Sequence, residues 1–236
     1  MILGSGGSRV LIAGTGSHPD GSTLPDVPAV AATVAELRRV FAERCGLTDR
    51  QLGEPVLDPT HTEFGDALSQ AASEAEGVLL FYYVGHGIVS PSNELFLATR
   101  ETDHHTERLH RALPYSIVEQ AISRTAARTV VVVLDCCFAG RAELPARPAA
   151  VAAVELAARG GAYVLAAASG EERALAVPGE PYTAFSAALI TVLREGDPAG
   201  LPDLTIEGVY RYLRRTLPAQ GLPAPSRRLA ERADDL

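Results

Sequence analysis

Two continuous apolar runs constrain the fold of this chain more than any other feature. Residues 77–84 read GVLLFYYV and residues 130–134 read VVVVL, so neither run alternates polar with apolar side chains. Strands of this composition are buried on both faces, as in a parallel sheet that helices cover on both sides. The two runs therefore predict core strands of a three-layer α/β/α domain.

Chemically active residues follow each run directly. Gly-His-Gly at 85–87 follows the first run, and Asp-Cys-Cys at 135–137 follows the second. Ligand-binding and catalytic groups of open parallel sheets lie beyond the carboxyl ends of the strands. If both runs belong to one parallel sheet, an imidazole, a carboxylate and two thiols emerge at the same edge.

The rest of the chain predicts helices and strands in alternation. Further strands are expected at 9–13, 56–57, 94–98 and 161–168. Helices with an apolar face are expected at 28–44, 63–74, 114–124, 149–158, 183–194 and 205–217. This order favours a mainly parallel sheet of roughly six strands with helices on both faces. No convincing closing strand follows Leu222, so residues 223–236 are predicted to be a disordered or truncated tail.

Composition narrows the class of protein. The 236 residues, 47% of them hydrophobic, suit one globular domain at 9–222, after a flexible leader at 1–8. The net charge of −8 argues against nucleic-acid partners, because such surfaces carry clustered positive charge. No apolar run reaches the ~18 residues of a membrane span. Three cysteines, two of them adjacent, form no disulfide framework, so we expect a cytoplasmic protein.

The histidine and the cysteines have an informative spacing. His86 precedes Cys137 by 51 residues, and a histidine about 50 residues upstream of the nucleophile is a caspase spacing. A thiolate is a strong nucleophile, while a nearby imidazole lowers the pKa of the thiol and protonates the leaving amine. The pair therefore indicates hydrolysis of a peptide bond more strongly than either residue alone.

The motifs YVGHG at 83–87 and DCCFAG at 135–140 resemble those of caspase-like cysteine peptidases, and of the bacterial metacaspase branch in particular. The animal caspase form, Gln-Ala-Cys-X-Gly, does not fit. The resemblance runs from about Arg9 to the end of the chain. It implies a caspase-like fold and an endopeptidase that cleaves protein substrates after Arg, with Lys as the second candidate. It also implies work with partner proteins in bacterial signalling or defence, including an activating partner.

The resemblance assigns roles residue by residue. Cys137 aligns with the catalytic nucleophile and His86 with its imidazole partner, whereas Cys136 takes the small-residue position. Because successive residues of an extended chain point to opposite faces, Cys136 is expected to face the interior. The backbone N–H groups of Cys137 and Gly87 are the expected donors to the oxyanion of the tetrahedral intermediate.

Acidic residues are expected to select the substrate. The metacaspase residue that matches Asp135 lies in the S1 pocket and pairs with a basic P1 side chain. A loop-ordering role for Asp135 is the alternative. The second acid of metacaspases, on their first helix, is replaced here by VAATV at 30–34. Asp26 is expected to help instead, with Asp20 and Glu171 as further candidates. The missing acid weakens any case for calcium, so no metal or cofactor is expected.

Two other functions stay open from the sequence. An inactive caspase-like scaffold or binding module keeps the fold without activity, although His86 and Cys137 argue against it. A doubly wound nucleotide- or effector-binding domain would use the glycine-rich turn at 14–16, because such turns can cradle phosphate. The turn completes neither a GxGxxG nor a Walker pattern, which favours a turn at the rim of the active site instead.

Overall fold

The computed structural model describes residues 3–104, 107–139, 161–167, 179–200 and 203–228. Eight strands of one sheet lie in these residues: β1 (Arg9–Gly14), β2 (Val56–Leu57), β3 (Val78–Val89), β4 (Leu95–Leu97), β5 (Leu113–Pro114), β6 (Thr129–Ala139), β7 (Tyr163–Ala166) and β8 (Ser226–Arg228). The helices are α1 (Ala29–Cys45), α2 (Asp49–Leu52), α3 (His61–Glu74), α4 (Tyr115–Arg124), α6 (Ala184–Glu195) and α7 (Ile206–Ala219).

The main sheet has the strand order β2-β1-β3-β6-β7-β8. Neighbours from β2 to β7 pair in parallel, and β8 pairs with β7 antiparallel. The two predicted apolar runs become β3 and β6, which pair side by side in the middle of the sheet. The structure therefore confirms the mainly parallel sheet of roughly six strands, to which β4 and β5 add a small antiparallel extension.

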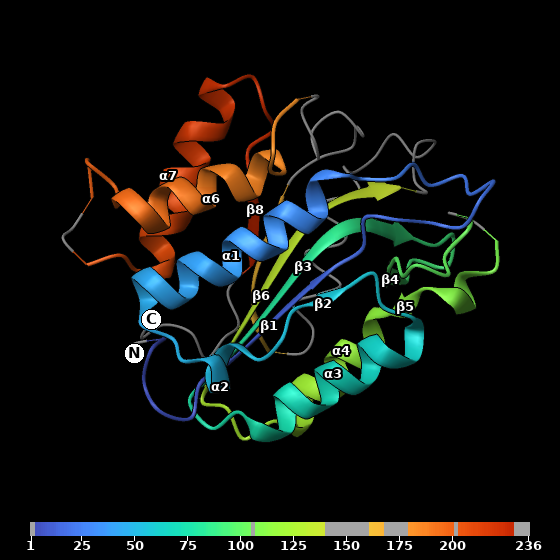
Figure 1. The fold of residues 1–236 in the computed structure, drawn as a ribbon, viewed down its shortest axis with the longest axis horizontal. Helices are drawn as coiled ribbons and strands as arrows, with labels where there is room; N and C mark the ends of the chain where they lie inside the picture. Colours follow the sequence, from blue (N-terminus) through green and yellow to red (C-terminus); the bar gives the residue numbers. More distant parts are fainter. Residues whose placement is uncertain (1–2, 105–106, 140–160, 168–178, 201–202, 229–236) are drawn as a thin grey trace.

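Helices cover both faces of the sheet (Figure 1), so the core has two halves. On one face, Leu79 and Phe81 of β3 belong to the same cluster as buried residues of α3 and α4. On the other face, Leu80 and Tyr82 belong to the same cluster as buried residues of α1, α6 and α7. Burial of alternate side chains on opposite faces explains why the two central strands are apolar throughout.

Local signals set the helix boundaries close to those expected. The hydroxyl of Thr60 accepts a hydrogen bond from the Glu63 N–H, and the Glu63 carboxylate accepts one from the Thr60 N–H. This capping box begins α3. At the other end of α1, Gly46 adopts a left-handed conformation with φ of 68°, and its N–H donates to the Phe41 carbonyl.

Three expectations about the chain differ from the structure. Residues 223–236 are not all tail, because Ser226–Arg228 form the closing strand β8. The predicted ends of the central strands are also wrong, since β3 continues through 85–89 and β6 through 135–139. In the expected leader, Ser8 is buried, and its hydroxyl accepts a hydrogen bond from the Val78 N–H.

Candidate active site

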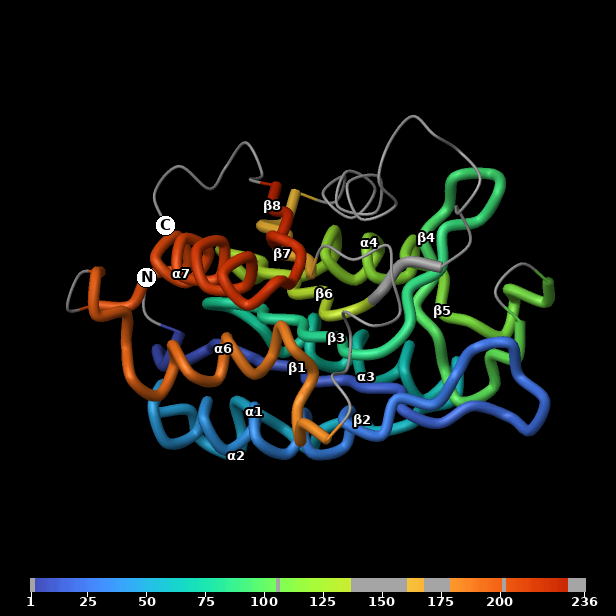
Figure 2. The backbone as a smooth tube through the Cα atoms, turned by 90° about the horizontal axis from the view of Figure 1, so that it is seen from above, coloured from blue at the N-terminus to red at the C-terminus, as the bar shows by residue number. Residues whose placement is uncertain are grey.

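The candidate site lies where β3 and β6 pair near their carboxyl ends. His86 and Cys137 are register partners across the two strands, and Val84 and Asp135 are partners two residues earlier. The segment that joins β1 to α1, residues 15–28, lies at this end of the sheet with β4 and β5 (Figure 2). The fold therefore brings the two predicted catalytic positions together although 51 residues separate them.

The ring of His86 is held by a backbone carbonyl. Its Nε2 lies 2.8 Å from the carbonyl oxygen of Pro25, and His86 is only 3% exposed. A carbonyl oxygen can only accept, so Nε2 must carry the proton in this contact. In the neutral ring, Nδ1 then has the lone pair, which is the arrangement that a general base requires.

The backbone of His86 is held as well. Its carbonyl accepts hydrogen bonds from the Ala98 N–H at 2.9 Å and from the Tyr83 hydroxyl at 3.0 Å. Gly85 has φ of 150°, and a Cβ there would lie 2.7 Å from the Tyr83 hydroxyl and 2.8 Å from the Thr15 carbonyl oxygen. Only glycine fits this position, so the Gly-His pair is required by packing as well as by chemistry.

The glycine-rich turn after β1 already binds an anion of the protein itself. The carboxylate of Asp58 accepts hydrogen bonds from the Gly16 N–H at 2.7 Å and from the Ser17 N–H at 3.1 Å. A Cβ on Gly16 would lie 2.8 Å from the Val27 carbonyl oxygen, because the segment 15–28 folds back closely here. These two donors are therefore occupied from within, which argues against the phosphate-binding interpretation.

Asp135 lies beneath α6 in a network of hydroxyl groups. Its Oδ2 accepts hydrogen bonds from the hydroxyls of Thr183 and Ser186, both at 2.5 Å. The Tyr82 hydroxyl lies 2.7 Å from that of Ser186 and extends the network. Asp135 is 1% exposed, and its Oδ1 is buried without a hydrogen-bond partner among the described residues. Within the described residues, the hydrogen bonds of this carboxylate thus gather on one of its two oxygens.

Burial dominates the ionisation of this carboxyl. Loss of hydration raises the pKa of Asp135 to about 6, while the hydrogen bonds from Ser186, Thr183 and Tyr82 oppose the rise. A carboxylate that is buried, incompletely paired and shifted toward neutrality is typical of functional sites. A cation that reached Oδ1 would stabilise the ionised form.

The other predicted acids lie elsewhere. Asp26 is exposed on segment 15–28, next to Pro25, and its carboxylate accepts a hydrogen bond from the His18 N–H at 2.9 Å. Asp20 is also exposed on this segment. Glu171 lies outside the described residues. Asp26 is therefore adjacent to the residue that binds His86, while its own carboxylate binds the backbone of the segment.

The two cysteines are separated by the alternation of β6. Cys136 is fully buried with Phe81 and Tyr83 in the half of the core that α3 and α4 cover, which confirms its expected inward orientation. Cys137 is described by its backbone, at the register position of His86. Gly87 pairs with Phe138, so both expected oxyanion donors belong to the paired strands, and their role stays a prediction.

Several groups that build the site were not foreseen. They are the Pro25 carbonyl, the hydroxyls of Tyr83, Thr183 and Ser186, and the ring of His18. The hydroxyls had a weak signal, since buried strands and helices seldom carry them without a partner. The Pro25 carbonyl had none, because every residue has such a group.

The described residues form neither a metal-binding cluster nor a helix that could span a membrane. No three or more side chains of His, Cys, Asp and Glu gather as metal ligands in that part of the chain. The described helices also include none with the length and apolar character that crossing a membrane requires.

Comparisons with known proteins agree with this geometry. The crystal structure of protein GSU0716 from Geobacter sulfurreducens has a similar fold, with a TM-score of 0.61 at 16% sequence identity. The match covers 94% of this chain and 91% of that chain. No curated protein matches the sequence. A family model described as the caspase domain matches residues 21–232, which is most of the chain. The protein belongs to the caspase-domain family of peptidases.

Proposed function

We propose that this protein is a cysteine endopeptidase that uses Cys137 and His86 and cleaves after Arg, with Lys as the second candidate. One observation carries the proposal: the Pro25 carbonyl holds Nε2 of His86, and His86 is the register partner of Cys137. A histidine whose proton is fixed on one nitrogen presents the other as a base. Strand alternation assigns position 137 to the same face as Asp135, opposite to Cys136.

The proposed reaction follows from these groups. Nδ1 of His86 takes the proton of the Cys137 thiol, and the thiolate attacks the carbonyl carbon of the scissile bond. The N–H groups of Gly87 and Cys137 bind the oxyanion. The C–N bond then breaks, and the imidazolium gives its proton to the leaving amine. Water, activated by His86, hydrolyses the thioester and restores the thiol.

The proposed specificity depends on Asp135. Its buried Oδ1 has no partner among the described residues, and leaving such a group unpaired costs about 1–3 kcal/mol. A guanidinium or ammonium at P1 would remove this cost and stabilise the carboxylate. Asp26 is exposed beside Pro25 and is proposed to add negative charge near His86, where it would attract a basic substrate. We place the activity in bacterial signalling or defence, with an activating protein partner.

The decisive experiment compares the two adjacent cysteines. Fluorogenic peptides with P1 Arg and P1 Asp are incubated with the wild type, Cys137→Ala and Cys136→Ala. We expect fast cleavage after Arg, none by Cys137→Ala, and retention of much of the activity by Cys136→Ala. Covalent labelling of Cys137 by an Arg chloromethylketone, located by mass spectrometry, identifies the nucleophile directly.

The controls separate the alternatives. Circular dichroism of each variant shows whether the fold is intact. Labelling of Cys136 in place of Cys137 would overturn the assignment of the nucleophile. Complete absence of turnover and labelling in folded wild type would favour the inactive scaffold. Preferential cleavage after Asp would leave the peptidase but remove the role of Asp135.

A further inference from the structure

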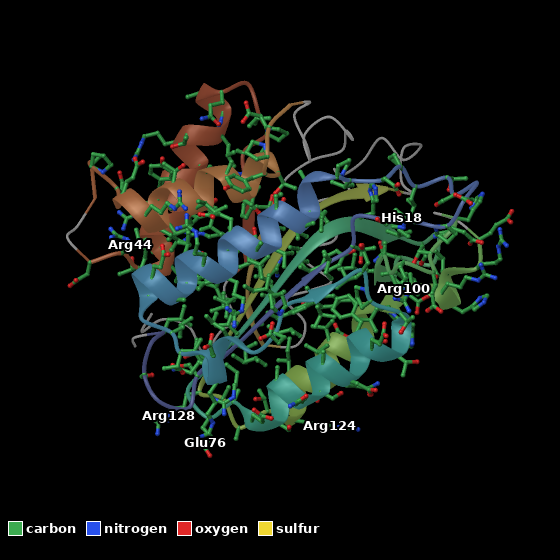
Figure 3. All side chains as sticks on the ribbon, in the orientation of Figure 1. His18, Arg44, Glu76, Arg100, Arg124 and Arg128 are labelled. Carbon is green, nitrogen blue, oxygen red and sulfur yellow. The ribbon has the colours of Figure 1, made fainter. Side chains whose placement is uncertain are left out.

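A second histidine lies against the proposed catalytic one. The ring centroids of His18 and His86 are 5.3 Å apart, and the rings are tilted by 43°. His18 belongs to segment 15–28, and Figure 3 shows it at the far end of the sheet from Glu76 and Arg128. The same segment therefore contacts His86 twice, through the Pro25 carbonyl and through the His18 ring.

Asp26 connects these two contacts. Its carboxylate accepts a hydrogen bond from the backbone N–H of His18. Because Asp26 directly follows Pro25, this hydrogen bond links the two parts of the segment that contact His86. The Val27 N–H donates to the Gly16 carbonyl at 2.7 Å, which closes the segment at its base. His18 is consequently held in place by the hydrogen bonds within its segment.

The ring of His18 makes no hydrogen bond within the described part of the chain. Both ring nitrogens are buried, and neither makes a hydrogen bond of acceptable geometry in the described structure. Burial and the neighbouring His86 lower the pKa of His18. The carboxylates of Asp26 and Asp58 oppose this, as does the Thr102 carbonyl, which is close enough to favour a proton without reaching hydrogen-bond geometry.

We propose that His18 is a positioning residue, whose neutral ring packs against His86 and keeps the His86 Nε2–H aimed at the Pro25 carbonyl. The inference rests on the proposed function, since His86 is taken to be the base. A ring that makes no hydrogen bond to the described residues acts on them by packing, so its shape matters more than its nitrogens. Small misplacements of a catalytic group cost large factors in rate, which gives this packing a catalytic consequence.

The neutral state of His18 is part of the proposal. During catalysis His86 becomes an imidazolium, and a second positive charge against it would be unfavourable. Acidification that protonates His18 should therefore lower activity. The groups that face His18 are His86, Asp26, Asp58 and the Thr102 carbonyl, and their balance sets the pH of this effect.

The test compares His18→Ala with His18→Phe, which keeps an aromatic ring but has no titratable group. His18→Ala should lower kcat for a P1 Arg peptide about tenfold with KM within about twofold, because only orientation is lost. His18→Phe should recover kcat to within about threefold of wild type and lose less activity on acidification. His110→Ala, at an exposed histidine outside the site, is the matched control and should leave both constants unchanged.

A second measurement does not depend on peptidase activity. In His-labelled protein, NMR reports how fast the Nε2–H proton of His86 exchanges with water. Exchange should accelerate in His18→Ala and stay slow in His18→Phe. If wild type cleaves no peptide but these exchange rates differ as stated, the proposed function fails and the positioning role stands. Unchanged kcat or exchange in His18→Ala, or a His18→Phe variant as impaired as His18→Ala, overturns the inference.

Discussion

The neighbouring ends of β3 and β6 hold their functional residues in opposite ways. A backbone carbonyl holds the ring at the His86 end, since the Pro25 carbonyl accepts from Nε2, while the Ala98 N–H and the Tyr83 hydroxyl donate to the His86 carbonyl. Side chains hold the Asp135 end, through the hydroxyls of Thr183 and Ser186. Substitutions cannot remove a backbone carbonyl, whereas they readily remove a hydroxyl. The hydrogen bond that fixes the proton of the proposed base therefore survives any change of the Pro25 side chain, whereas the hydrogen bonds of the proposed specificity residue depend on two side chains.

The two ends also differ in their cost to the fold. The Nε2 of His86 is paired, while Oδ1 of Asp135 has no hydrogen-bond partner in the described part of the chain, and its carboxyl has a pKa raised to about 6. A buried carboxylate that is ionised at neutral pH destabilises the folded chain. Ionised Asp135 thus lowers the stability of the folded chain. In the proposed function, the cationic side chain of the substrate would offset this loss when it binds.

The largest expected effect is a loss of catalysis that does not depend on the P1 residue of the substrate. His86→Ala should lower kcat by about a thousandfold or more for every substrate, because members of a catalytic unit fail together. Stopped fluorogenic assays with P1 Arg and P1 Gln peptides measure this. A His86→Ala variant that retained activity toward either peptide would contradict the role of the base.

Removal of the charge on Asp135 should have a smaller and more selective effect. Asp135→Asn should lose about 2 kcal/mol of preference for P1 Arg over P1 Gln, as expected for a desolvated ion pair. The kcat/KM ratio of the two peptides gives this value, and P1 Gln cleavage serves as the internal control. An unchanged ratio would show that P1 is selected elsewhere.

The pH dependence sharpens the comparison further. The kcat/KM for P1 Arg should fall as pH decreases through about 6, because protonated Asp135 attracts the cation less. Ser186→Ala removes a hydrogen bond that lowers the Asp135 pKa, so the acid limb should move to higher pH. Thr191→Ala, whose hydroxyl bonds the Ala187 carbonyl within α6, is the matched control. If the acid limb of Ser186→Ala stays at the pH of wild type, Asp135 is not the group whose titration causes that limb.

The smallest expected effect concerns stability. Because the folded pKa of Asp135 lies above the ordinary value of 3.8 for an aspartate, the native state binds more protons than the unfolded chain between about pH 4 and 6, and stability falls as pH rises. Asp135→Asn abolishes this loss. The unfolding free energy of the variant minus that of wild type should therefore increase by about 1 to 2 kcal/mol when the pH is raised from 5 to 8. Urea unfolding of both proteins at both pH values measures this difference. A stability advantage of the variant that is larger at pH 5 than at pH 8 would contradict the prediction.

Particular residues show how far sequence patterns reach. The apolar runs predicted β3 and β6 because doubly buried strands need apolar side chains at every position. The same pattern could not locate their ends, since pairing continues through residues such as Gly85 and His86. It missed β8, whose Ser226, Arg227 and Arg228 pair with only one neighbour at the edge of the sheet. Such an edge strand needs no apolar run.

The order, spacing and type of residues were enough to determine the layered fold, the family resemblance and the meeting of His86 with position 137. These follow from side-chain periodicity and from parallel pairing, both of which are written in the sequence. Tertiary structure alone decided which group orients His86, which oxygen of Asp135 accepts the hydroxyls of Thr183 and Ser186, and that His18 packs against His86. The reason is that Pro25 and His86 are 61 residues apart, and a backbone carbonyl carries no mark of its partner in the residue type.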